Sequence, residues 1–204
     1  ESDKNVFDIG ALSLSNIREY RPINKRDFFN KYNIKDMPYC LVTFHPETYA
    51  FEKNKNYVIE MIKALEFAST KINLIVTMPN ADNLGTIYRE KLYFLKKKIQ
   101  DKILLIENFG KEDYFSAMYY SDFLLGNTSS GIIEAASFGK YVINVGDRQK
   151  GRLQSLNIYN VPFESSQISS AVKTLINKGK YLGENLYFKE KSEDKIIEIL
   201  KTHK

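Results

Sequence analysis

Cysteine, long apolar runs and leader-like segments are scarce or missing in this chain, and each absence excludes a class of protein. Cys40 is the only cysteine among the 204 residues, so a disulfide within the chain and a thiolate metal site are both excluded. No apolar run approaches the ~20 residues that a membrane-spanning helix needs, and no signal peptide is visible. We therefore expect a cytoplasmic protein that binds neither a membrane nor a metal ion.

Clustered arginine is also missing, although the chain is basic. A net charge of +5 and a pI near 9.0 would suit a nucleic-acid-binding protein. The lysines, however, are spread along the chain, without the arginine clusters and interleaved aromatic residues that base recognition uses. We expect a solvated, lysine-rich surface that favours a phosphate-bearing small ligand, and no nucleic-acid partner.

Short apolar runs alternate with amphipathic segments, and this order predicts an α/β fold. The length suits one domain, or at most two small ones, and 43% hydrophobic residues can form a sizeable core. Strands are predicted at Tyr39–Phe44, Ile72–Met78, Ile103–Ile106, Phe123–Leu125, Tyr141–Val145 and Asn160–Pro162. Helices are predicted at Asn24–Tyr32, Asn56–Ala68, Leu84–Ile99, Lys111–Tyr120, Ile132–Phe138, Glu164–Asn177 and Ser192–Lys201. We therefore expect a Rossmann-like, doubly wound parallel sheet with helices on both faces.

The stretch from Ser121 to Arg152 contains the pattern with the most chemical meaning. A strand runs into a polar loop of Gly, Asn, Thr and Ser, a helix with a small-residue face follows as far as Gly139, and a second strand leads to a basic loop. Free backbone N–H groups and hydroxyls at a helix start can bind a phosphate. Glu134 could then accept hydrogen bonds from sugar hydroxyls. The same residues would also serve as ordinary helix caps without a ligand.

His45 and Asn80 follow two of the predicted strands. Because the carboxyl ends of parallel strands line the ligand crevice of an open α/β sheet, both residues should face that crevice. A lone histidine after a strand can equally be a packed structural residue, and Asn80 sits in a Pro/Asn/Asp sequence that suits an ordinary turn.

The segment GNTSSGIIEAASFG, followed by VINVGDRQKGR, resembles the signature of the hydrolysing UDP-N-acetylglucosamine 2-epimerases. These enzymes release UDP and a free 2-epimerised amino sugar. The resemblance implies a GT-B-like enzyme of two Rossmann-like domains that face each other across a cleft, in which this chain is the C-terminal half. Residues 1–20 would be the interdomain linker, and residues 21–204 the nucleotide-binding domain, including the helix at 192–201.

The resemblance also implies roles for individual residues. His45 lies in an H-P-x-T sequence that matches a functional histidine of the family, and it would be the catalytic residue of this half. The acidic base residues would lie in the missing N-terminal domain. UDP would be bound by Asn80, Asn108, Thr128, Ser129, Ser130, Gly131, Glu134 and Arg148.

The expected reaction is elimination of UDP across C1 and C2 of the sugar, followed by addition of water to the resulting glycal. No cofactor is expected, and the full-length enzyme should be a homo-oligomer. Two other functions stay open: a GT-B glycosyltransferase, and a nucleotide-binding module that acts alone. The identity of the amino sugar stays open as well, since its contacts would come largely from the other half.

Overall fold

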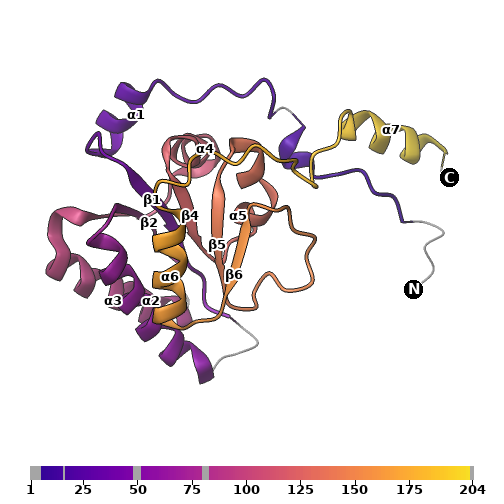
Figure 1. Ribbon diagram of the computed structural model, residues 1–204. Helices are drawn as coiled ribbons and strands as arrows, with labels where there is room; N and C mark the ends of the chain where they lie inside the picture. The colour runs from indigo at the N-terminus through magenta and orange to yellow at the C-terminus, as the bar shows by residue number, and fades with distance from the viewer. Residues whose placement is uncertain (1–5, 16, 48–51, 80–82, 203–204) are drawn as a thin grey trace.

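The computed structural model describes residues 6–15, 17–47, 52–79 and 83–202 of the chain. Its six strands form one parallel sheet in the order β3-β2-β1-β4-β5-β6 (Figure 1). The strands are β1 Tyr39–Thr43, β2 Asn73–Thr77, β3 Ile103–Ile106, β4 Phe123–Gly126, β5 Tyr141–Val145 and β6 Ile158–Val161. This is the doubly wound, Rossmann-like arrangement, and the predicted fold class is confirmed.

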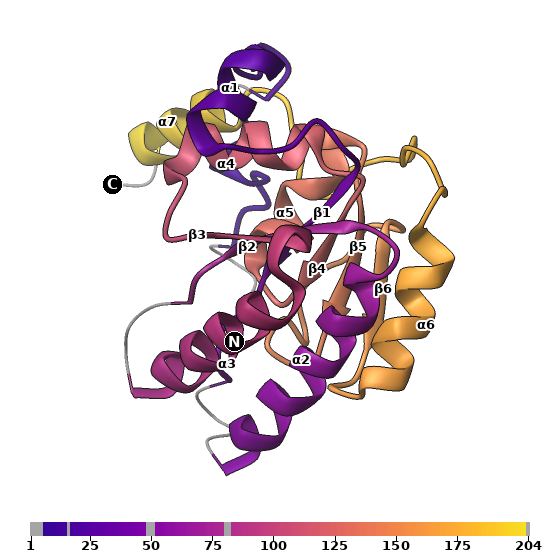
Figure 2. The same ribbon diagram turned by 90° about the vertical axis from the view of Figure 1, so that its left-hand side faces the viewer.

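Helices cover both faces of the sheet (Figures 1 and 2). The helices are α1 Lys25–Tyr32, α2 Asn54–Ser69, α3 Asn83–Ile99, α4 Gly110–Tyr120, α5 Ser129–Ile133, α6 Ser165–Leu175 and α7 Ser192–Thr202. Short 3-10 turns lie at Leu12–Leu14, Gln100–Lys102 and Ala135–Phe138. Helices α2, α3 and α6 supply the core on one face, and α1 and α4 supply it on the other. None of the described helices is both long and apolar enough to cross a membrane.

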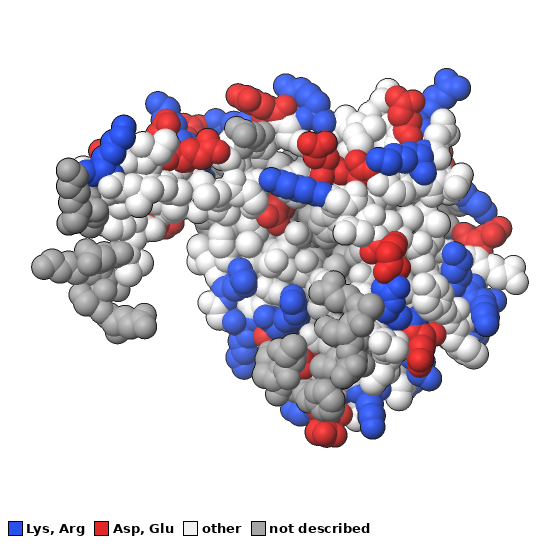
Figure 3. Space-filling model, turned by 180° about the vertical axis from the view of Figure 1, so that it is seen from behind, with Lys and Arg blue, Asp and Glu red and all other residues white. Residues whose placement is uncertain are grey.

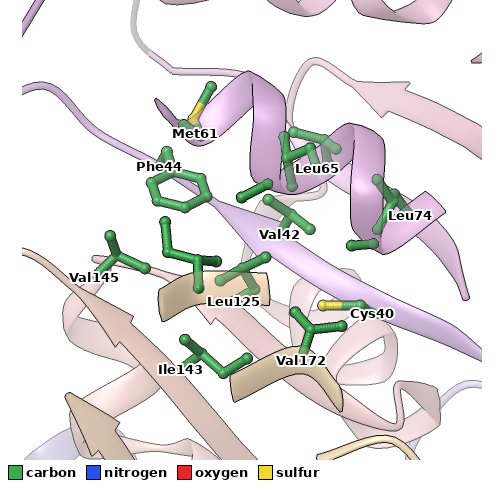
Figure 4. Close-up of a cluster of buried hydrophobic side chains, with 14 of the residues drawn as sticks. Cys40, Val42, Phe44, Met61, Leu65, Leu74, Leu125, Ile143, Val145 and Val172 are labelled. Atoms are coloured by element: carbon green, nitrogen blue, oxygen red, sulfur yellow. The ribbon is translucent and has the colours of Figure 1, made fainter. Parts of the chain in front are cut away.

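Alternation along each strand divides the buried side chains between these two faces. In β1, Cys40 and Val42 point into the cluster formed with α2, α3 and α6 (Figure 4), whereas Tyr39 and Leu41 pack on the side of α1 and α4. All five residues of β1 are buried. A parallel strand covered on both faces reads as a continuous apolar run, and this is why the sequence predicts β1 so clearly.

The direction of strand addition reverses at β1, which has β2 on one side and β4 on the other. The chain reaches β2 through α2, but it returns past β1 through α4 to enter β4. The segments that leave β1 and β4 therefore diverge at the carboxyl edge of the sheet, and a crevice opens between them. His45 follows β1, and Thr128 follows β4.

The helix expected at Ile132–Phe138 is instead two shorter pieces, and this prediction was wrong in detail. Helix α5 covers only Ser129–Ile133, and a 3-10 turn continues at Ala135–Phe138. In a continuous α-helix, the N–H of Ser137 would donate to the carbonyl of Ile133. Here the carbonyl of Ile133 accepts from the side-chain amide of Asn185 (2.8 Å), and the N–H of Ser137 donates to the carbonyl of Glu134. As predicted, the segment ends at Gly139, in the left-handed conformation.

The segment before α1 lies beside the segment that leads to α7, although the two are far apart in sequence (Figure 1). The N–H of Ala11 donates to the carbonyl of Tyr187 (2.9 Å), and Arg18 pairs with Glu190 at 2.5 Å. Leu14 of this segment is buried. The two chain segments thus stabilise each other, and a domain boundary at residue 20 stays a prediction.

Charged side chains of both signs are interspersed on the face drawn in Figure 3. The described residues include several exposed ion pairs, such as that between Lys35 and Asp101 (3.0 Å). Exposed pairs of this kind contribute little to stability, about 0–1 kcal/mol each. On this face the positive charge does not gather into the continuous stripe that a nucleic acid would need.

Candidate functional site

A cavity of about 280 Å³ lies at the carboxyl edge of the sheet, where the strand order reverses. It is lined by Thr43, His45, Thr77, Met78, Glu107, Asn108, Phe109, Gly110, Tyr114, Thr128 and Ser130. Four of the predicted site residues, His45, Asn108, Thr128 and Ser130, therefore line one cavity. They follow β1, β3 and β4, and the first and last of them, His45 and Ser130, are 85 positions apart in the sequence.

Three hydroxyl groups contribute to the lining of this cavity. The side-chain oxygens of Thr43 and Thr77, on neighbouring strands, lie 2.7 Å apart, and the hydroxyl of Tyr114 lies 3.4 Å from Thr43. Burial raises the pKa of Tyr114 to about 12, so this phenol keeps its proton at neutral pH. The cavity therefore offers hydrogen-bonding groups that carry no charge of their own.

The polar loop after β4 provides the start of α5. The Thr128 hydroxyl accepts from the backbone N–H of Ser130 (3.4 Å), as an N-cap residue does. Gly131 is buried, and a Cβ there would lie 3.1 Å from a methyl group of Val142 on β5. Since α5 has only five residues, its dipole is small. The hydroxyls and N–H groups of Thr128, Ser129 and Ser130, rather than a long helix, would have to attract an anion.

Glu134 is buried and only 7% exposed. The hydroxyl of Ser13, from the segment before α1, donates to its Oε1 (2.6 Å). Its buried Oε2 has no hydrogen-bond partner among the described residues. Burial raises the pKa of this carboxyl above its usual value, although hydrogen bonds from Ser13 and Ser130 act in the opposite direction.

Asn127, which the sequence analysis did not single out, joins the ends of β1 and β4. The backbone N–H of His45 donates to Asn127 Oδ1 (2.7 Å), and Asn127 Nδ2 donates to the carbonyl of His45 (2.8 Å). Asn127 is completely buried, whereas His45 is half-buried. The backbone of His45 is therefore fixed at the mouth of the crevice.

Arg148 lies on the basic loop after β5 and does not line the cavity that contains His45. Its Nη1 donates to the backbone carbonyl of Asn127 (3.2 Å), the residue that directly precedes Thr128 of the cavity lining. Partial burial lowers the pKa of its guanidinium, and the nearby charge of Arg152 acts in the same direction. Arg148 still carries its charge at neutral pH because its ordinary pKa is so high.

The basic loop is held by a second residue that sequence reasoning missed, Glu47. Its Oε1 accepts the backbone N–H groups of Asp147 (2.9 Å) and Arg148 (3.1 Å). Gly146, with φ +76°, permits this approach, because a Cβ there would lie 2.5 Å from the same oxygen. Glu47 is only 1% exposed, although it lies just two residues after His45 in the sequence.

The basic loop also borders a larger, separate cavity of about 710 Å³ at the ends of β5 and β6. Lys150 and Arg152 line it together with the amides of Asn144, Gln154 and Asn160. These amides are bonded to one another: Asn144 donates to Asn160 (2.8 Å), which donates to Gln154 (2.7 Å).

The turns after β2 and β3 form the other side of the crevice. Asn80 lies outside the described residues. Asn108 is exposed, and its Oδ1 accepts the N–H of Gly110 (2.7 Å). Arg89 braces both turns by donating to the carbonyl of Pro79 (2.9 Å) and to the carboxylate of Glu107 (2.8 Å). No group of three or more metal-binding side chains gathers within the described part of the chain.

These features define a Rossmann-like α/β protein with a polar crevice at the point where the strand order reverses. The sequence model of the UDP-N-acetylglucosamine 2-epimerase family matches residues 1–201. The chain belongs to this family, so the resemblance seen in the signature is confirmed.

Curated relatives agree over nearly the whole chain. The chain is 32% identical over 205 residues to the UDP-N,N'-diacetylbacillosamine 2-epimerase (hydrolyzing) of Legionella pneumophila, covering 99% of this chain and 53% of that protein. It is 31% identical over 206 residues to the Escherichia coli polysialic acid biosynthesis protein P7, covering 98% and 52%. The chain spans about half the length of these relatives and corresponds to their C-terminal half.

Solved structures show the same fold. The chain is similar, with a TM-score of 0.78 and 17% identity, to the Methanocaldococcus jannaschii UDP-GlcNAc 2-epimerase in complex with UDP-GlcNAc and UDP, covering 99% of this chain and 56% of that one. It is similar to S. aureus MnaA with UDP at a TM-score of 0.72 and 18% identity, covering 100% and 54%. At this level of identity the likeness concerns the fold alone.

Proposed function

We propose that this chain is the UDP-binding half of a hydrolysing UDP-N-acetylglucosamine 2-epimerase. The observation that carries the proposal is the cavity that joins His45, Asn108, Thr128 and Ser130 at the reversal of the strand order, in a chain of this family. A nucleotide sugar is a ligand that can use both the hydroxyl groups of Thr43, Thr77 and Tyr114 in this cavity and the hydroxyl-rich loop after β4.

The residues divide among the parts of the ligand. The diphosphate would lie on the N–H groups and hydroxyls of Thr128, Ser129 and Ser130, with Gly131 allowing α5 to pack closely on β5. The base or ribose would meet the turns that carry Asn80 and Asn108. Glu134 would accept hydrogen bonds from ribose hydroxyls only where the segment that carries Ser13 moves away from it, because its Oε2 is buried in this structure. Arg148 would add positive potential from the next loop.

The reaction would proceed by elimination and addition. A base removes the proton at C2, the C1–O bond to UDP breaks, and the electron pair of the C2–H bond forms the double bond of a glycal. Water then adds to give the free 2-epimer. His45 would stabilise the negative charge that collects on the departing diphosphate, and the base would belong to the other half of the protein.

Two assays test this proposal. Calorimetry with UDP, CDP and GDP on the chain should give heat of binding with UDP. The intact protein, supplied with UDP-N-acetylglucosamine and no acceptor, should release UDP and a free amino sugar. UDP binding without release in the intact protein would favour a binding module, and release that requires a sugar acceptor would favour a glycosyltransferase. The relatives named for diacetylbacillosamine make that UDP-sugar the second substrate to assay. Cytoplasmic location and homo-oligomer formation by the intact protein stay expectations.

A further inference from the structure

The side chains proposed to act on the diphosphate, His45 and Arg148, come from loops after different strands. His45 follows β1, whereas Arg148 lies 103 positions further along the chain, after β5. Their relative position therefore depends on residues that contact both loops.

Asn127 contacts both of them from behind the cavity. Its side-chain amide makes two hydrogen bonds to the backbone of His45 (2.7 and 2.8 Å). Its backbone carbonyl accepts from Arg148 Nη1 (3.2 Å) and from the side-chain amide of Gln149 (2.8 Å). One buried residue thus bonds to the end of β1 with its side chain and to the loop after β5 with its main chain.

The divergence of the strands explains why an amide is needed at this position. Backbone pairing between β1 and β4 ends at Thr43 and Gly126, and one further bond runs from the N–H of Asn127 to the carbonyl of Thr43 (3.1 Å). Beyond that point β4 turns toward α5, so His45 has no neighbouring strand. An asparagine side chain carries one donor and one acceptor and can replace a strand backbone for one residue.

We propose that Asn127 is a positioning residue that sets His45 and Arg148 relative to the bound diphosphate, an inference that rests on the proposed function. Asn127 is completely buried and does not line the cavity, so it acts through these two residues and not on the ligand itself. Glu47 supports the same arrangement by accepting the N–H groups of Asp147 and Arg148.

Asn157 offers a matched control. It is also completely buried, and its amide also donates to a backbone carbonyl, that of Lys140 (2.8 Å). It lies just before β6, at the amino edge of the sheet, opposite the crevice. Replacing it removes a buried asparagine of the same kind without touching the site.

The experiment compares Asn127→Ala, Asn127→Asp and Asn157→Ala in the intact protein with UDP-N-acetylglucosamine. Because a misplacement of ~1 Å can cost 10²-fold in rate, kcat should fall about 10- to 100-fold in both Asn127 variants, with KM changed less than about threefold. Asp is isosteric with Asn and keeps the acceptor for the N–H of His45, but its second oxygen replaces the donor to the carbonyl of His45, so this variant removes one bond without leaving a cavity. Asn157→Ala should melt earlier but keep its kcat per folded molecule.

A second measurement does not depend on turnover. The chain has two histidines, His45 and His203, so NMR of the imidazole groups can follow His45 directly. Its resonances should shift in both Asn127 variants and not in Asn157→Ala. Unchanged kcat in Asn127→Asp, or an equal loss in Asn157→Ala, would overturn the proposal. If the wild-type protein released no UDP, the proposed function would fail separately, and the His45 resonances would still decide whether Asn127 places that side chain.

Discussion

Folding favours the protonated form of the Glu134 carboxyl group, whereas the proposed ligand contact needs the carboxylate. Burial raises its pKa, so the folded protein holds this proton more tightly than the unfolded chain does. Ionisation of Glu134 therefore opposes folding at pH values above the ordinary range of glutamate. The carboxylate is nevertheless the form that would accept hydrogen bonds from ribose hydroxyls.

Replacing Glu134 with Gln should separate these two effects. The amide oxygen can still accept from Ser13, but no charge is buried, so the variant should melt at a higher temperature than the wild type at pH 7. The difference should shrink as the pH falls through the raised pKa of Glu134. UDP affinity should fall roughly tenfold to a hundredfold, since a hydrogen bond to a charged group contributes about 1.5–3 kcal/mol. Thermal melts across pH and calorimetry measure both; a variant that binds UDP as well as the wild type would leave Glu134 a purely structural role.

His45→Ala should lower kcat far more than it raises KM in the intact protein. The negative charge on the leaving diphosphate grows as the C1–O bond breaks, so a group beside it stabilises the transition state more than the bound substrate. A single acid or electrostatic group typically supplies about 10²–10⁴-fold. Steady-state kinetics and a thermal melt on the same preparation check this. A lower melting temperature with full turnover per folded molecule would make His45 a packing residue.

The residues that follow strands could be predicted from the sequence because strand ends of a parallel sheet meet at one edge. The position of His45 at this edge was predicted in this way, and Thr128 and Ser130 of the polar loop after β4 line the same cavity. The burial of Glu134 could not be predicted, because its cover, Ser13, lies 121 positions earlier. The contacts of Asn127 with His45 and of Glu47 with Asp147 likewise span 82 and 100 positions. No local pattern encodes such pairs.

At the level of the elements, the pairing of β1 with β4 depends on a residue without a side chain. Gly126 ends β4 with φ +149°, and a Cβ there would lie 1.9 Å from the carbonyl oxygen of Thr43 on β1. Such a contact cannot be relieved by a rotamer change, since both partners are backbone atoms. The two strands that border the crevice can lie this close only because position 126 is glycine.

Gly126→Ala should therefore destabilise the sheet strongly, by more than about 3 kcal/mol, which is at the upper end of single substitutions. Gly179→Ala is a suitable control, because φ is also positive there (+82°) but nothing lies within 4 Å of the added Cβ. Urea unfolding of both variants separates steric overlap from backbone strain. Equal losses in the two would show that the β1–β4 contact is not the cause.

Sequence patterns are sufficient to predict the bounds of some strands, but not the break after α5. Strands β3 and β5 have the predicted bounds, because a buried parallel strand is a short apolar run between turn residues. The break between α5 and the following 3-10 turn could not be predicted, since the amide that stabilises it comes from Asn185, 52 positions after Ile133. The local sequence IIEAASF, from Ile132 to Phe138, carries no glycine or proline that would mark this break.

For the molecule as a whole, the question is what one half of such an enzyme can do. Three carboxyl groups at or near the crevice have partners among the described residues. Glu107 pairs with Arg89, Glu134 accepts from Ser13, and Glu47 accepts from the loop after β5. Elimination requires a base at C2 and a cleft from which water is excluded. The proposed nucleotide site lies in this half, but Glu107, the carboxyl residue that lines its cavity, pairs with Arg89 and does not stand ready as that base.

We therefore expect the 204-residue chain to bind UDP but to release none from UDP-N-acetylglucosamine. The residues proposed to bind UDP, Thr128, Ser129, Ser130 and Asn108, belong to this chain, whereas loss of a general base alone typically lowers the rate about 10²–10⁴-fold. An open crevice that admits water lowers it further, because every electrostatic interaction with the diphosphate is weaker there. Calorimetry with UDP tests the expected binding, and chromatographic detection of released UDP tests the expected lack of turnover, both on one preparation. Turnover by the purified chain would contradict it, and a loss of that turnover in Glu107→Gln would identify Glu107 as the base.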